Sequence, residues 1–116
     1  MSLDCIWILP KENQKAPEFF QMLSIKRSFF YANEILAFKG KLYSEWLELN
    51  LGYTLYQEKK DNKEIKELNK QLQNIKFKIT AFEGEDNEEL TVKEIKDFII
   101  MWNECSNLNA TLVGWW

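Results

Sequence analysis

The feature that most constrains this chain is its apolar C-terminal stretch, which ends in two consecutive tryptophans, Trp115 and Trp116. Terminal residues are usually frayed unless other parts of a protein hold them, and each indole can bury roughly 150–250 Å². We therefore expect this stretch to pack against the core or to meet a partner. A strand over 110–116 would turn Trp116 toward the core with Leu112, and Trp115 toward the opposite face. Trp115 is the predicted contact residue.

The length and composition predict one folded domain spanning 1–116. At 116 residues the chain has the size of a common single domain. Its 15% aromatic content argues against disorder, because disordered chains contain few aromatic residues. No apolar run approaches the roughly 18 residues of a membrane span. The first residues lack the basic start of a secretory signal, so we expect a cytoplasmic protein that does not bind membranes.

The sequence contains no histidine, which removes the usual general base near neutral pH and the commonest metal ligand. The acidic run over 83–89 lacks the ligand spacing of a calcium loop and is interpreted as solvated. We predict no catalytic residues, no metal and no cofactor, and hence a protein that is not an enzyme. The net charge of −3 also disfavours nonspecific nucleic-acid binding, which normally requires a basic face.

Cys5 and Cys105 are the two cysteines. In a cytoplasmic chain we expect them to be reduced, buried thiols, because disulfides persist mainly in oxidising compartments. A disulfide between the first and last elements is the alternative.

Hydrophobic periodicity and capping residues outline the elements. A strand over 3–9 is ended by Pro10, and a helix is expected to start at Pro17 and to continue to about residue 31. A second helix covers 41–51 and ends before Gly52. A short extended segment over 53–57 follows.

The second half of the chain carries two capping signals. Asp61 with Glu64 predicts the start of a helix that runs to about Gln73, and Thr91 with Glu94 predicts the start of another. The apolar positions of the first of these helices form either a coiled-coil seam or a face packed on the domain's own core. These positions are Ile65, Leu68, Leu72 and Ile75.

Two periodicities compete over 75–82. Apolar residues alternate there with lysines, which favours a strand, whereas three of the positions also fit a continued helix. We expect the strand.

These elements predict an α+β fold. The N- and C-terminal strands would lie in one antiparallel or mixed sheet, packed by three or four helices. An apolar terminal strand at the edge of that sheet would invite pairing with another chain.

Two groups of side chains are candidates for binding. Lys26 and Arg27 precede Tyr31, and such a set could hold a phosphate and stack a base, with Lys39 and Lys41 nearby in the sequence. The aromatic residues Tyr43, Trp46, Tyr53 and Tyr56 could form an interface, where aromatic anchors are enriched, and Trp115 is the separate contact residue named above. For both groups the alternative is structural: the first as a helix with a basic edge, the second as a buried Trp46 with the tyrosines at its rim.

We therefore expect a small cytoplasmic interaction protein, an inhibitor or accessory factor that occludes a protein partner. The bias toward Lys, Asn and Ile is typical of AT-rich genomes, including those of phages. The alternative is a protein that binds an anionic, nucleotide-like small molecule, with a homodimer enclosing the ligand. A third, less favoured interpretation is an enzyme that works without histidine.

Overall fold

The computed structural model describes residues 2–13, 15–31 and 35–116. Its main element is a five-stranded sheet in which every neighbouring pair is antiparallel. In spatial order the strands are β2 (Phe29–Tyr31), β3 (Ile35–Lys39), β1 (Asp4–Ile8), β7 (Thr111–Trp115) and β4 (Lys59–Lys60). The predicted α+β class is confirmed, and the sheet is antiparallel rather than mixed.

The first and last strands of the chain pair along their whole length. Asp4 lies opposite Trp115, and the register continues to Ile8 opposite Thr111. The prediction that the two terminal strands share a sheet is confirmed. The prediction of an edge strand is wrong, because β4 pairs with the other side of β7 and the strand lies inside the sheet.

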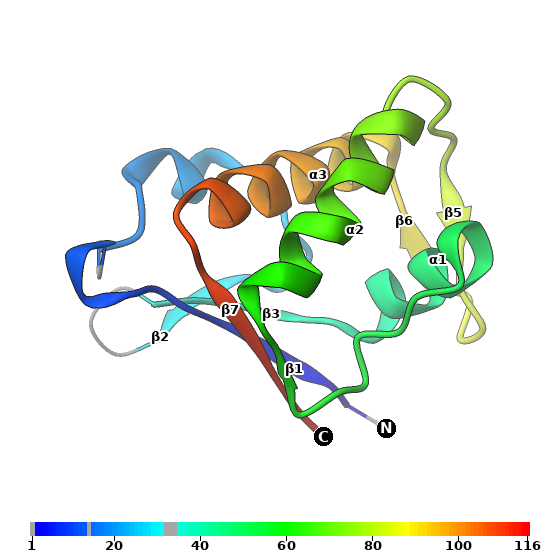
Figure 1. Cartoon of the computed structure of the whole chain (residues 1–116). Coiled ribbons are helices and arrows are strands. Elements are labelled where there is room, and N and C mark those ends of the chain that lie inside the picture. The colour runs from blue at the N-terminus through cyan, green and yellow to red at the C-terminus, as the bar shows by residue number, and fades with distance from the viewer. Residues whose placement is uncertain (1, 14, 32–34) are drawn as a thin grey trace.

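Three α-helices lie on one side of this sheet or beside it (Figure 1): α1 (Lys41–Leu51), α2 (Asn62–Ile75) and α3 (Val92–Asn107). The chain caps them locally, as expected. The Asp61 carboxylate accepts a hydrogen bond from the backbone N–H of Glu64, and Thr91 and Glu94 form a complete capping box. Gly52 ends α1 with a φ of 64°, a left-handed conformation that suits glycine.

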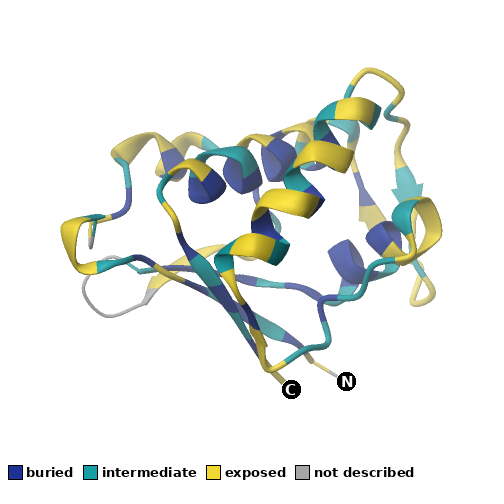
Figure 2. Ribbon diagram, in the orientation of Figure 1, coloured by how far each residue is buried: buried dark blue, intermediate teal, exposed yellow. Residues whose placement is uncertain are grey.

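The core lies between α2, α3 and the sheet, as the burial colours of Figure 2 show. Ile65, Leu68 and Leu72 of α2 are fully buried there, so the apolar face of this helix packs on the domain itself rather than forming a coiled-coil seam. The rings of Trp7 and Trp102 meet edge to face at 5.0 Å. Trp102 donates a hydrogen bond from its indole nitrogen to the carbonyl of Ile65.

The aromatic residues of α1 also enter the core. Trp46 is buried, as expected, but Tyr43 is fully buried and stacks on Phe98 at 4.5 Å, where the sequence suggested a rim position. Burial raises the pKa of the Tyr43 hydroxyl. That hydroxyl accepts a hydrogen bond from the backbone N–H of Lys26, and so fixes the turn that carries the cationic residues.

The helix predicted from Pro17 to residue 31 is wrong. Among the described residues between β1 and β2, the chain forms two short 3₁₀ helices, Lys11–Asn13 and Glu18–Met22, before it enters β2 at Phe29. Aromatic residues favour strands, and β2 is completed by pairing with β3, which a helical pattern over one segment could not foresee.

The strand predicted over 75–82 is also wrong. Helix α2 continues to Ile75, and only β5 (Phe82–Glu83) is a strand, paired with β6 (Glu89–Leu90) in a separate hairpin. The alternating pattern exists, but residues 76–81 pair with no neighbouring strand in the described structure, and Phe77 remains 86% exposed. The acidic run over 83–89 therefore forms this hairpin, and the segment 53–57 is a loop that leads to β4.

Candidate functional site

The sheet presents one face to the helices and the other face to solvent. Successive side chains of a strand point to opposite sides, and those directed at the helices are buried in every strand of the middle of the sheet. In Figure 1 the helices of the described chain lie on one side of the sheet only. We call the opposite side the outer face. It consists of Asp4, Ile6, Ile8, Phe29, Ile35, Ala37, Lys39, Lys59, Thr111, Val113 and Trp115.

Register places five of these residues in one row across all five strands, which we call the central row. Phe29 lies opposite Ala37, Ala37 opposite Ile6, Ile6 opposite Val113, and Val113 opposite Lys59. Four neighbouring positions of the row are therefore apolar, and a single lysine stands at one end. Phe29 is exposed, Ile6 and Val113 are half-buried, and Ala37 is fully buried between its neighbours. An antiparallel sheet that faces water normally carries polar side chains on its solvated face. The central row departs from this pattern.

A second row of the outer face combines a charge pair with an aromatic ring. Asp4 lies opposite Lys39 on one side and opposite Trp115 on the other, and the Lys39 ammonium forms an ion pair with the Asp4 carboxylate. The Trp115 side chain is 70% exposed. Trp115 therefore points away from the core, in keeping with the sequence-based expectation.

Trp116 does not close the core. Strand β7 ends at Trp115, so the next residue is no longer held to the alternation of the strand. Its indole is 50% exposed and packs edge to face on Tyr56 at 5.6 Å. The expectation of a core position is wrong, and Tyr56 and Trp116 instead form an aromatic pair beside Trp115.

Tyr53 has structural partners rather than a free ring. The ammonium of the buried Lys60 lies 4.4 Å from the centre of the ring, and the Tyr53 hydroxyl donates a hydrogen bond to Glu64. Burial lowers the pKa of Lys60 and raises the pKa of Tyr53. This buried lysine was not singled out in the sequence, where it stands in an ordinary polar run.

A second candidate site is a cavity of about 320 Å³ at the start of α1. Lys26, Arg27, Lys39 and Lys41 all line it. The structure therefore brings together the four cationic residues that the sequence suggested as a group. Glu45, Asp86 and Glu88 also line this cavity, so its charge is largely balanced.

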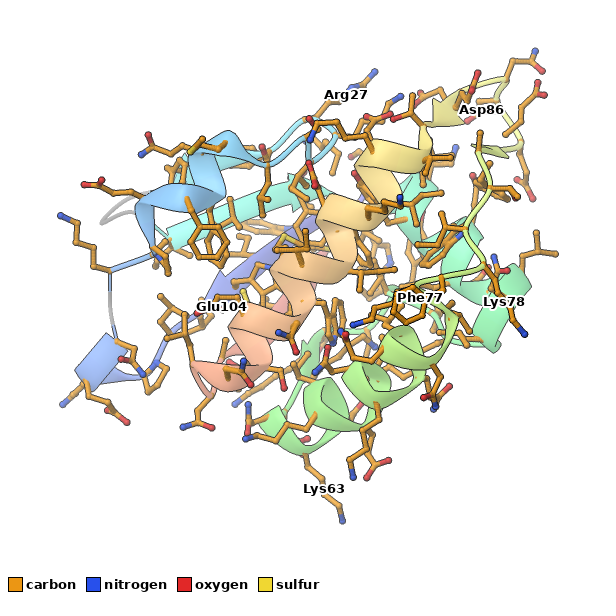
Figure 3. All side chains as sticks on the ribbon, turned by 90° about the horizontal axis from the view of Figure 1, so that it is seen from above. Arg27, Lys63, Phe77, Lys78, Asp86 and Glu104 are labelled. Atoms are coloured by element: carbon orange, nitrogen blue, oxygen red, sulfur yellow. The ribbon has the colours of Figure 1, made fainter. Side chains whose placement is uncertain are left out.

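Acidic groups of the β5–β6 hairpin engage the cations. Lys41 forms an ion pair with Asp86, which raises the pKa of Lys41 and lowers that of Asp86. Arg27 lies 3.9 Å from Glu88, and Figure 3 shows Arg27 and Asp86 on the same side of the molecule. Burial raises the pKa of Glu45, which lines the same cavity. An incoming anion must displace these carboxylates.

The described lining of this cavity contains no aromatic ring. The side chain of Tyr31 lies outside the described residues, and its backbone belongs to β2. Stacking of a base, as expected for a nucleotide-like ligand, has no support from the lining residues.

The six predicted binding residues thus occupy separate places. Lys26 and Arg27 lie at the cavity, Tyr53 lies beside Lys60, and Tyr56 and Trp115 lie near the C-terminal end of β7. The apolar outer face escaped notice in the sequence, although a signal was present. Both alternating sets of β1, Cys5 with Trp7 and Ile6 with Ile8, are apolar.

Both thiols are buried and free, so the structure contains no disulfide between Cys5 and Cys105. Burial raises the pKa of Cys5 to about 12 and that of Cys105 well above its usual value.

No helix in the described part of the chain is long and apolar enough to cross a bilayer. Comparison of the chain with known protein families, with curated proteins and with solved structures finds no match.

Proposed function

We propose that this chain is a small cytoplasmic, non-enzymatic protein that binds another protein through the outer face of its sheet. By covering a surface of that partner it would act as an inhibitor or accessory factor. The observation that carries the proposal is the central row, on the side of the sheet that no described helix covers, where three apolar residues keep accessible surface: Phe29, Ile6 and Val113.

The outer face has the composition of an interaction surface. Contiguous exposed apolar residues on a soluble domain mark binding sites more often than single ones do. Tryptophan is among the residues most enriched at the energetic centre of protein interfaces. Trp115 lies beside the central row with most of its side chain exposed. The Asp4–Lys39 pair gives the face a polar border.

Replacing Trp115 with alanine tests this proposal. The wild-type protein, Trp115→Ala and Phe77→Ala would each be immobilised and exposed to a lysate of the source cells. Phe77 is the matched control, because it is also a largely exposed aromatic residue but lies past the end of α2 on the helix side (Figure 3). We expect a protein that the wild type and Phe77→Ala retain and Trp115→Ala loses. For the purified partner, loss of a tryptophan anchor weakens binding by about 2 kcal/mol or more, which is roughly thirty-fold in Kd.

Retention of the same protein by all three baits would contradict the outer face as the binding surface. The melting temperatures of the three proteins must agree, so that loss of binding is not loss of fold.

A second candidate function is the binding of a small anion in the cationic cavity. It is favoured by the convergence of four cationic side chains on one hollow. Inorganic phosphate, pyrophosphate and a nucleoside triphosphate would be tested by thermal shift on the wild type and on Arg27→Ala. A ligand at 100 times its Kd should add about 2.7 kcal/mol of stability.

We expect an equal response to pyrophosphate and to the nucleotide, because the described lining offers no ring to stack a base. The response should fall in Arg27→Ala. An unchanged melting temperature with all three anions would remove this candidate and would leave the outer-face proposal as it stands.

A further inference from the structure

We propose that the outer face also packs against the outer face of a second copy, in a weak symmetric dimer of two facing sheets. This goes beyond the proposed function and does not depend on it, since self-association holds whether or not a different protein binds there. The argument starts from the order of residues along the central row. Val113 and Ala37 flank Ile6 at equal distances, one strand away on either side, and Lys59 and Phe29 flank it two strands away.

A two-fold axis that runs along β1 between the two sheets matches unlike residues. Such an axis keeps the rows aligned but exchanges the two sides of the sheet, so that β7 faces β3 of the second copy and β4 faces β2. Val113 then lies over Ala37 of the second copy, which is fully buried in its own monomer, so this pair brings together no like charges and adds little contact. Lys59 faces Phe29, and an ammonium over an aromatic ring is a favourable contact. Ile6 faces itself on the axis.

The second row, formed by Lys39, Asp4 and Trp115, also matches unlike residues across this axis. Trp115 faces Lys39 of the second copy, which is a second cation–ring contact. Asp4 faces Asp4, and this is the one like-charge contact. The ion pair between each Asp4 and its own Lys39 surrounds the two carboxylates with two ammonium groups, so this set of four charges is neutral.

The other two-fold axis in the interface plane, perpendicular to the strands, is disfavoured. Through Ile6 it would set every residue of the central row over its own copy. Lys59 would then face Lys59, which brings two like charges together at an exposed position. The axis along β1 avoids this contact between like charges. Either axis keeps the strands of the two sheets nearly aligned, as in the aligned packing of two sheets at about −30°.

The size of the face limits the strength of this dimer. Five strands about 4.8 Å apart and five residues of about 3.4 Å each give a footprint of at most ~400 Å² per copy. The two copies together would cover ~800 Å², below the ~1,200 Å² at which specific, stable interfaces begin. We therefore expect an association that depends on concentration and leaves the face free in dilute protein.

Sedimentation equilibrium over a wide range of protein concentrations tests the dimer. We expect the wild type to shift from monomer toward dimer as its concentration rises into the millimolar range. Ile6→Glu should remain a monomer throughout, because it places two carboxylates face to face on the axis. Ile100→Glu is the control. It introduces the same charge at a partly exposed apolar position of α3 on the helix side, and should dimerise like the wild type.

Cross-linking tests the axis. Two single variants, Lys59→Cys and Phe29→Cys, would be treated separately and as a mixture with a bismaleimide that spans about 10 Å, the spacing of packed sheets. The native thiols are buried and should not react. We expect cross-linked dimers in the mixture only. The two copies of residue 59, or of residue 29, would lie about 19 Å apart across the strands in addition to the spacing between the sheets, which is beyond the reach of the reagent.

A wild type that stays monomeric at its highest soluble concentration would overturn the dimer. So would equal loss of dimer in Ile6→Glu and Ile100→Glu, since the surface would then not be the outer face. Efficient cross-linking of Lys59→Cys alone would overturn the axis along β1. None of these results decides the capture experiment with Trp115→Ala, so the failure of the two proposals can be distinguished.

Discussion

Gly114 marks a close backbone approach in the sheet. A Cβ atom at this position would lie 2.6 Å from the carbonyl oxygen of Gln57 and 3.1 Å from that of Leu55. The loop that leads to β4 can therefore lie against β7 only because residue 114 has no side chain. The backbone N–H of Gly114 also donates a hydrogen bond to the carbonyl of Glu58.

Gly114→Ala should destabilise the fold by about 1–3 kcal/mol, the cost of overpacking a tight site. The obstacle is backbone oxygen, which cannot move away as a flexible side chain can. Urea unfolding followed by tryptophan fluorescence measures the loss. Thr111→Ala, in the same strand but on the outer face, is the control and should change the midpoint little. Equal midpoints for Gly114→Ala and the wild type would show that the loop can shift at no cost.

Predictions for single residues of the C-terminal segment succeeded within strand β7, where successive side chains point to opposite faces. They failed beyond the end of the strand. The pattern over 110–116 assigned Leu112 and Trp115 to opposite sides, as observed. It failed for Trp116, because the strand stops one residue earlier and the indole is then free to meet Tyr56. The partners of Tyr53 could not be foreseen, because Lys60 reaches its ring only after β4 and α2 are folded.

At the scale of elements, Asp97 of α3 holds the irregular segment that precedes β2 through a hydrogen bond to its backbone. The carboxylate is almost fully buried and accepts hydrogen bonds from the backbone N–H of Ser24 at 2.7 Å and from the Lys93 ammonium at 3.1 Å. The segment between Met22 and Phe29 has no regular secondary structure, so this bond and that of Lys26 to Tyr43 hold it in place.

Asp97→Ala should lower the free energy of unfolding by about 1–3 kcal/mol, because it leaves the Ser24 N–H without its partner. Lys93→Ala is the matched control. It removes only the exposed member of the ion pair and should cost at most about 1 kcal/mol. Chemical denaturation gives both values, and hydrogen exchange at Ser24 should quicken in Asp97→Ala alone. A larger loss in the lysine variant would contradict this assignment.

Elements with local signals could be predicted, and elements that depend on distant pairing could not. The caps at Asp61 and Thr91 involve residues within one turn, so the sequence locates both helix starts. Strand β2 depends on β3, and residues 76–81 have no strand to pair with in the described structure. In both cases periodicity within one segment is insufficient, because a strand requires a neighbour.

At the scale of the whole molecule, the α+β class and the pairing of the terminal strands follow from the sequence. The outer face does not, because the side of a sheet that remains uncovered depends on where the helices pack. Ile6 and Trp7 are both apolar, and only the folded chain shows that Trp7 is directed at α3 and Ile6 at the outer face. The balanced charge of the cavity could not be predicted from the sequence either, because it depends on the β5–β6 hairpin, which brings Asp86 and Glu88 to the cavity.

The pairing of Asp4 with Trp115 has a consequence for how the protein is made. Strand β1 lies at the centre of the sheet, and its contacts with β7 span almost the full sequence. Such a fold has a high contact order, which slows folding, because a long loop must close before the contact forms. During synthesis β1 therefore lacks one of its two pairing partners until β7 has emerged. In that interval Ile6 and Trp7, which lie on the two faces of β1, stay accessible to chaperones.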